Sequence, residues 1–202
     1  KVETVAYHGA EPGKNADELV EKAIQDGADM VFTTSPKLVG ASLRAALRHP
    51  DVRILNCRVD VGDDCITLKS GTEETPSPVP CENIVIANCL LVHGHGGIVI
   101  GSEMSGGVRN VTVTNCVFTG TDRGLRVKTR RRRGGCVENL RLSNLVMERV
   151  FCPFVFNMYY SCGTAEKDRW VWEKTPYPVD GGTPAFRNIR INGVTVVGAT
   201  AS

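Results

Sequence analysis

The stretch RNVTVTNCVF at residues 109–118 carries the main signal for the architecture, because its pattern occurs three more times in the chain. In each copy apolar residues alternate with polar ones, which is the period of a half-buried β-strand. The other copies are ENIVIANCLL at 82–91, ENLRLSNLVM at 138–147 and RNIRINGVTV at 187–196. A β unit that recurs about every thirty residues is typical of a solenoid. Since no helical period separates the copies, we predict an all-β parallel β-helix over residues 57–202.

An asparagine near the end of each copy predicts a ladder along one turn of the coils. The expected members are Asn56, Asn88, Asn115, Asn144 and Asn192. We expect their side-chain amides to stack and to hydrogen-bond backbone groups of adjacent coils. The longer interval before Asn192 contains an insertion at about 163–185, rich in Trp, Tyr and Pro, which we expect to form a loop beside the binding face.

The composition of the chain limits the classes of function that it can have. A net charge of +2 over 202 residues does not indicate a chain that binds nucleic acid or membranes through its overall charge. No run of 18 apolar residues predicts a transmembrane helix, and the first residues lack the apolar region of a signal peptide. The first residue is Lys1 rather than Met, so we expect a fragment, and we read no localisation signal from it.

Eight cysteines could form disulfides, but their placement favours thiols. Cys57, Cys89 and Cys116 each follow an asparagine of the predicted ladder, which indicates stacked, buried thiols. No C-x-x-C motif occurs, so a zinc ribbon is not expected.

Residues 1–56 follow an α/β pattern instead. NADELVEKAIQDGAD predicts a helix, with Asn15 and Glu18 as a capping box and Gly27 at the end. DMVFTTS and DVRILNC predict strands on either side of a second helix, LVGASLRAALRHP. We expect an α/β fragment that is not an independent domain and that caps the open end of the β-helix.

Three motifs follow the ladder asparagines at comparable distances: Gly62-Asp63-Asp64, Gly94-His95-Gly96 and Arg126-Val127-Lys128. Equivalent positions of a β-helix stack about 4.8 Å apart, so these side chains should meet on one face. Strand alternation places Arg126 and Lys128 on the same side. We expect Gly62 to let both carboxylates reach one groove, and the glycines around His95 to let a ligand approach.

The ordered set GDDCITLKSG, VHGHGGIVIGSE and DRGLRVKTRRRRGG resembles glycoside hydrolase family 28, the polygalacturonases, over about residues 53–202. The resemblance implies a right-handed parallel β-helix and inverting hydrolysis of α-1,4-galacturonosyl bonds in pectin, by two carboxyls about 6.5–9.5 Å apart. It implies Asp63 as general acid, Asp64 as water-activating base and His95 as the residue that tunes their protonation. Arg126 and Lys128 would bind the sugar carboxylate, and Tyr160 would contact substrate. We also expect neighbouring carboxylates to raise one another's pKa and so keep the acid protonated.

The family's third carboxylate, in an upstream Asn-Thr-Asp-Gly stretch, has no counterpart, because Ser42 stands at the corresponding place and no Asp or Glu lies between Asp29 and Asp51. Residues 1–57 instead resemble the basic membrane protein family of nucleoside-binding lipoproteins. We therefore hypothesise a chimera joined near 53–57.

Other functions remain as alternatives. A polysaccharide-binding β-helix with impaired catalysis fits the missing carboxylate. A pectate lyase would use calcium and a basic residue, and nucleoside binding would use residues 1–56. We expect no cofactor and no metal, an anionic oligogalacturonide as the partner, no nucleic acid or membrane, and a monomer. The run KTRRRR at 128–133 is interpreted as a solvated loop beside the groove rather than a nucleic-acid site. Of the other histidines, His8, His49 and His93 are expected to be surface or structural residues.

Overall fold

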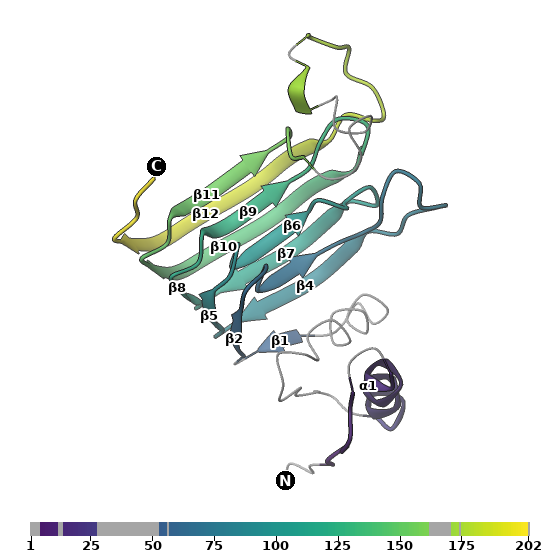
Figure 1. Cartoon of the computed structure of the whole chain (residues 1–202), viewed down its shortest axis with the longest axis vertical. Coiled ribbons are helices and arrows are strands. Elements are labelled where there is room, and N and C mark those ends of the chain that lie inside the picture. The colour runs from purple at the N-terminus through teal and green to yellow at the C-terminus, as the bar shows by residue number, and fades with distance from the viewer. Residues whose placement is uncertain are drawn as a thin grey trace. The chain divides into compact units, whose positions relative to one another are not determined.

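A computed structural model describes residues 5–11, 14–27, 53–55, 57–161, 171–173 and 175–201. The chain divides into two compact units, Lys1–Arg53 and Ile54–Ser202 (Figure 1). Within the described ranges, no helix is long and apolar enough to cross a membrane. The strand expected at DMVFTTS, the helix after it, Ser42 and Asn56 lie outside the described residues.

The described part of the first unit contains helix α1 (Ala16–Gln25), as its sequence predicts. The helix buries Ala16, Val20 and Ala23 on one face. The expected capping box is wrong, since Asn15 makes no side-chain bond to the helix. Its amide instead accepts from the backbone N–H of Glu11 at 2.7 Å and donates to an earlier carbonyl, because the chain before the helix folds back over it.

The second unit is a right-handed parallel β-helix, which confirms the predicted fold. Its larger sheet contains β1 (Arg53–Leu55), β2 (Arg58–Val61), β4 (Cys81–Ala87), β5 (Leu90–His93), β7 (Val108–Thr114), β8 (Val117–Thr119), β10 (Cys136–Glu148) and β12 (Ala185–Val197). Its smaller sheet contains β3 (Ile66–Leu68), β6 (Ile98–Gly101), β9 (Arg123–Lys128) and β11 (Cys152–Asn157). Each coil runs through the larger sheet, turns a corner and adds one strand to the smaller sheet (Figure 1).

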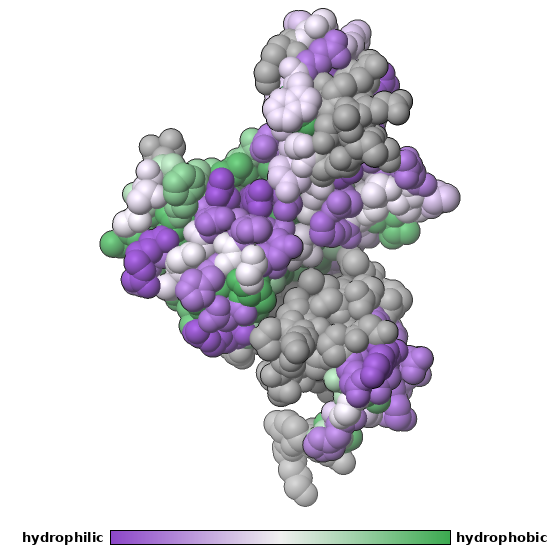
Figure 2. Space-filling model, viewed as in Figure 1, coloured by the Kyte–Doolittle hydropathy of each residue, from purple (hydrophilic) through white to green (hydrophobic). Residues whose placement is uncertain are grey.

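The core is made of side chains that repeat in register from coil to coil. Leu91 pairs with Phe118, and Phe118 pairs with Met147 in the next coil, and all three are fully buried. These are the apolar positions of the repeats, so the period of two along each strand places them inside. The visible face in Figure 2 accordingly carries many hydrophilic side chains, with hydrophobic colour in smaller patches.

The asparagine ladder exists, but it differs from the prediction in two ways. Asn115 donates to the side-chain oxygen of Asn88 at 3.2 Å, and Asn144 donates to Asn115 at 2.8 Å, so the described rungs join side chain to side chain. Asn192 is not a rung, because it pairs with Ser143 and leaves Gly193 opposite Asn144. The described rungs and Gly193 have a positive φ, which asparagine and glycine adopt most readily.

A second ladder, which was not predicted from the sequence, lies five residues earlier in each repeat. Its members are Asn83, Asn110, Asn139 and Asn188, joined side chain to side chain. The signal for it in the sequence is the asparagine after the first charged residue of each copy. Both ladders satisfy polar groups where the coil bends through a left-handed residue.

The seven cysteines within the described residues form no disulfide with one another, in line with the expected thiols. Cys65, Cys81, Cys89 and Cys116 are buried in the coil interior. Cys89 and Cys116 follow their ladder asparagines on adjacent coils, as the repeat requires.

Candidate active site

The predicted site lies on the outer face of the smaller sheet, where three coils stack in register. Ile66 pairs with Ile98, and Ile98 pairs with Leu125, so the motifs before and within β3, β6 and β9 stand side by side. Asp63 and Asp64 occupy the corner between β2 and β3 rather than a strand. Because a corner does not alternate side chains between two faces, neighbouring carboxylates can reach one groove.

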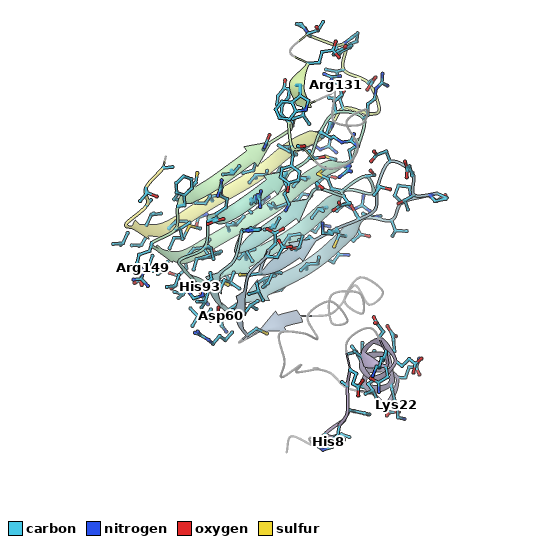
Figure 3. All side chains as sticks on the ribbon, viewed as in Figure 1. His8, Lys22, Asp60, His93, Arg131 and Arg149 are labelled. Atoms are coloured by element: carbon cyan, nitrogen blue, oxygen red, sulfur yellow. The ribbon has the colours of Figure 1, made fainter. Side chains whose placement is uncertain are left out.

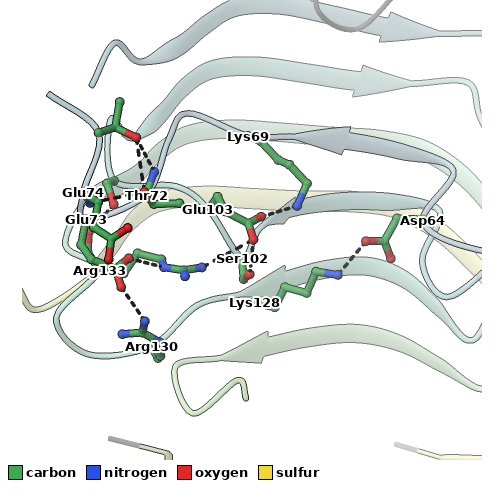
Figure 4. Close-up of polar contacts among 12 residues, drawn as sticks. Asp64, Lys69, Thr72, Glu73, Glu74, Ser102, Glu103, Lys128, Arg130 and Arg133 are labelled. Atoms are coloured by element: carbon green, nitrogen blue, oxygen red, sulfur yellow. Dashed lines mark hydrogen bonds and ion pairs between the residues drawn. The ribbon is translucent and has the colours of Figure 1, made fainter. Parts of the chain in front are cut away.

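Asp64 is the ion-pair centre of the cluster. One carboxylate oxygen lies 2.6 Å from Lys128 Nζ and the other lies 3.4 Å from Arg126 Nη1 (Figure 4 draws the lysine contact). The side chains of Asp64 and Lys128 are each only 8% exposed, so this pair is largely removed from water. As predicted, Arg126 and Lys128 point to the same side of β9.

Tyr160 lies beside this group. Its ring lies under the guanidinium of Arg126 at 5.3 Å and under Lys128 Nζ at 5.1 Å. The Tyr160 backbone N–H donates to the carbonyl of Thr129 at 3.0 Å, which fixes the segment after β11 against the end of β9. Cations over an aromatic face are attracted by the ring quadrupole.

Asp63 and His95 form a second, exposed pair beside the first. His95 Nδ1 lies 3.4 Å from a carboxylate oxygen of Asp63, and the two side chains are 59% and 86% exposed. The same carboxylate oxygen accepts the backbone N–H of Asp64 at 2.8 Å. The two aspartates therefore have different surroundings, one buried against cations and one open to water.

The expected upward shift of the carboxylate pKa is wrong for Asp63. The hydrogen bond from the Asp64 N–H, and then the charges of His95 and Lys128, hold the pKa of Asp63 below its usual value. Partial desolvation raises the pKa of Asp63, but it does not outweigh these interactions. Crowding by Asp64 does not raise it, because the charge of Asp64 is neutralised by Lys128 and Arg126.

Of the motif glycines, Gly94 allows the coils to stack closely, whereas Gly62 does not have this role. A Cβ on Gly94 would lie 2.4 Å from the carbonyl oxygen of Asp63, so the preceding coil approaches there, not a ligand. Gly62 has open space and no positive φ, so the expected role of Gly62 is wrong. The corner itself turns the carboxylates.

The arginine run is not a solvated loop, and that expectation is wrong. Arg130 and Arg133 are 1% and 6% exposed and both bind Glu73, at 2.6 and 3.1 Å. Arg131, labelled in Figure 3, donates to the carbonyl of Pro178 at 3.0 Å, and Arg132 lies 3.6 Å from Asp180. The run binds two surface segments, one that contains Glu73 and one that contains Pro178 and Asp180. The sequence could not show these contacts, because both segments are far from the run along the chain.

Two histidines outside the site lie on the surface, as expected. His8 and His93 are exposed, and His93 Nδ1 lies 2.8 Å from Asp60 (Figure 3), whereas His49 lies outside the described residues.

Lys69 and Glu103, which were not predicted from the sequence, form an ion pair next to Lys128 (Figure 4). Lys69 stands in GDDCITLKSG, at the strand position that corresponds to Lys128 in its own coil. That correspondence is the signal by which the repeat could have indicated it. Across the ranges that the structure describes, no three His, Cys, Asp or Glu side chains are grouped to hold a metal ion.

Comparisons with known proteins agree with this fold. The family model described as "Glycosyl hydrolases family 28" matches residues 47–169, which is more than half of the chain. The chain is 38% identical over 112 residues to an endo-polygalacturonase of Pectobacterium carotovorum subsp. carotovorum, covering 54% of this chain and 26% of that protein. It is 28% identical over 138 residues to a probable polygalacturonase of Vitis vinifera, covering 61% and 28%.

Among solved structures, an exopolygalacturonase from Thermotoga maritima matches with a TM-score of 0.59 and 34% identity, over 73% of this chain and 31% of that one. A family 28 exopolygalacturonase of Yersinia enterocolitica matches with a TM-score of 0.58 and 27% identity, over 75% and 25%. The fold and the cluster define a parallel β-helix with cationic side chains on one sheet and acidic side chains at the corner beside it. The chain belongs to glycoside hydrolase family 28. It spans between 20% and 28% of the length of its first curated relatives.

Proposed function

We propose that this chain carries the active site of a polygalacturonase-type enzyme, which hydrolyses α-1,4-galacturonosyl bonds in pectin or oligogalacturonides with inversion. The observation that carries the proposal is the pair of adjacent aspartates in opposite surroundings. Asp64 is buried against two cations, and Asp63 is open to water beside His95. Two carboxyl groups in different environments are what acid and base roles require.

In this proposal Asp63 gives its proton to the glycosidic oxygen while the bond from that oxygen to the anomeric carbon breaks. A water molecule attacks the anomeric carbon from the opposite face, and Asp64 takes the proton that the water releases. His95 holds Asp63 and returns protons to it between turnovers. The lowered pKa of Asp63 leaves this group ionised near neutrality in the unliganded chain. Bound uronide buries Asp63 and adds a negative charge, and both effects raise its pKa.

Arg126 and Lys128 recognise the carboxylate of the sugar. A guanidinium has five N–H donors, and one of those of Arg126 lies near Asp64 at 3.4 Å, so its fork suits a second carboxylate. Tyr160 supports both cations through its ring face. The same two side chains therefore hold the base and the substrate in one frame.

The test is release of reducing ends from polygalacturonate by the unmutated chain, by Asp63→Asn and by Asp64→Asn, with the anomer of the new end read by NMR. We expect each substitution to lower kcat by about 10²- to 10⁴-fold. Asp60→Asn is the matched control, because Asp60 also pairs with a histidine but lies outside the cluster. For the unmutated chain, kcat/KM should rise as the pH falls toward the lowered pKa of Asp63, since the protonated fraction grows.

Unchanged turnover in Asp63→Asn and Asp64→Asn would show that the site is wrong. If the unmutated chain binds polygalacturonate without releasing reducing ends, the alternative of a catalytically impaired polysaccharide-binding β-helix is correct. An unsaturated product that absorbs in the ultraviolet would instead indicate a lyase.

A further inference from the structure

Lys69 and Lys128 occupy equivalent positions two coils apart. Leu68 pairs with Ile100 and Ile100 pairs with Val127, so the next residues, Lys69, Gly101 and Lys128, follow one another across β3, β6 and β9. With neighbouring strands about 4.8 Å apart, the two lysine backbones lie about 10 Å from each other along the coil axis.

The residue between these lysines in the middle coil is glycine, where the backbones of adjacent coils approach closely. Gly101 has a φ of +92°, and a Cβ there would lie 2.1 Å from the carbonyl oxygen of Lys128. The middle coil therefore has no side chain at this register. Figure 4 shows Lys69 in contact with Glu103 and Lys128 in contact with Asp64.

Glu103 pairs with Lys69, but it also has two other polar partners. The carboxylate of Glu103 pairs with Lys69, accepts from Ser102 at 3.1 Å and lies 3.9 Å from Arg133 Nη1. If Lys69 turned to another anion, Glu103 would keep the arginine and the hydroxyl. The Lys69 side chain is 47% exposed, whereas that of Arg133 is 5% exposed, so Lys69 is the member of this cluster that solvent and ligand reach.

The wider cluster has an excess of positive charge. Three cations, Lys69, Arg130 and Arg133, share the two carboxylates of Glu73 and Glu103. The buried Arg130 Nε and Arg133 Nη1 have no hydrogen-bond partner within the described residues. An additional anion near Lys69 would therefore be attracted by the whole group.

We propose that Lys69 binds a second carboxylate of the substrate, at a subsite beside the one at Arg126 and Lys128, with Glu103 as its positioning residue. This rests on the proposed function, since a uronide carries one carboxylate on every sugar. A chain lying across β3, β6 and β9 meets Lys128 and Lys69 in turn. The subsite selects de-esterified oligouronides over substrates with a single carboxylate.

The experiment compares trigalacturonate with its fully methyl-esterified form and with an aryl α-galacturonide, which has one carboxylate. We expect Lys69→Met to raise KM or Kd for trigalacturonate about tenfold, the size of one charge-assisted hydrogen bond. The aryl substrate should show no change, and the ratio between the acid and the ester should fall by the same tenfold. Lys69→Arg should restore binding. The unchanged aryl substrate separates this role from a merely structural one, since a structural defect would affect both substrates.

Lys22→Met is the matched control, because Lys22 is also an exposed lysine paired with a carboxylate, Asp26, but lies on α1. Circular dichroism melting checks that each variant is folded. Equal affinity of Lys69→Met and the unmutated chain for trigalacturonate would overturn the inference and leave the proposed function standing. If the unmutated chain neither binds nor cleaves trigalacturonate, the proposed function fails and this inference fails with it.

Discussion

Asp63 and Asp64 are neighbours in sequence, yet we expect them to contribute to stability to very different extents. Asp64 neutralises Lys128 inside a cluster that excludes most water, whereas Asp63 touches mainly solvent and His95. Breaking a buried ion pair leaves an uncompensated charge, which costs far more than losing an exposed one. Comparing substitutions of these two residues therefore measures how much burial adds to the cost of breaking an ion pair.

We predict that Asp64→Ala lowers the free energy of unfolding by about 3 kcal/mol, because Lys128 loses its nearest carboxylate. Asp63→Ala should change it by less than about 0.5 kcal/mol, as exposed substitutions usually do. Urea unfolding of both variants measures this difference. Equal destabilisation of the two would show that the buried ion pair is not what distinguishes them.

The lowered pKa of Glu103 predicts that the free energy of unfolding falls at acid pH. Burial raises its pKa, but hydrogen bonds and the charge of Lys69 outweigh burial and bring the pKa from 4.5 to about 2. A folded-state pKa below the unfolded value gives stability that is complete above about pH 4.5 and is lost as the pH falls toward 2.

Unfolding in urea at intervals between pH 5 and pH 2 should therefore show a declining free energy. Glu103→Gln should make that decline shallower, because one carboxylate no longer takes up a proton on unfolding. A slope that stays the same in Glu103→Gln would assign the acid limit to other carboxylates.

Among the elements, the corners of the coils depend on asparagine for two reasons. Each rung adopts a left-handed backbone, and each side chain bonds the rung above or below. Asn115 is the middle rung and makes both bonds. Gly193 shows that the backbone requirement alone is enough in the next coil.

We predict that Asn115→Ala costs about 2 kcal/mol, from the left-handed backbone and the two lost amide bonds together. Asn115→Gly should cost less, about 1 kcal/mol, because glycine accepts a positive φ without strain. Thermal or urea unfolding of the two variants separates the contributions. If alanine and glycine were equally costly, the backbone conformation would contribute nothing measurable.

Across the β-helix unit as a whole, stacks of buried side chains run through successive coils and hold them together. Phe118 lies in the middle of the stack with Leu91 and Met147 and is fully buried. A Cβ on Gly97 would lie 2.2 Å from its ring, so the ring fills the space that this glycine leaves.

We predict that Phe118→Ala lowers the free energy of unfolding by about 3–5 kcal/mol, through lost transfer energy and the cavity left behind. Phe118→Leu should cost clearly less, because more of the volume remains. The far-ultraviolet signal of strand content during urea unfolding measures both. A cost below about 1 kcal/mol for Phe118→Ala would mean that the coil collapses around the cavity.

The β-helix and most of the candidate site follow from local patterns in the chain. A period of two along each strand and a repeat between coils are such patterns, and parallel stacking converts them directly into register. For that reason spacing predicts Asp64, Arg126 and Lys128 as neighbours, and the family resemblance adds Tyr160. The helix at 16–25 follows from its amphipathic spacing in the same way.

Which charges meet, in contrast, depends on the packing of the coils and loops. Arg130 and Arg133 are predicted as solvated residues but lie against Glu73, because the path of the loop that carries Glu73 is not encoded in the coil repeat. The pKa of Asp63 likewise depends on distances to His95 and to the Asp64 N–H, which spacing does not give. Periodicity fixes which residues share a face, while ion pairing and desolvation depend on distances of a few ångströms that only the packed coils and loops set.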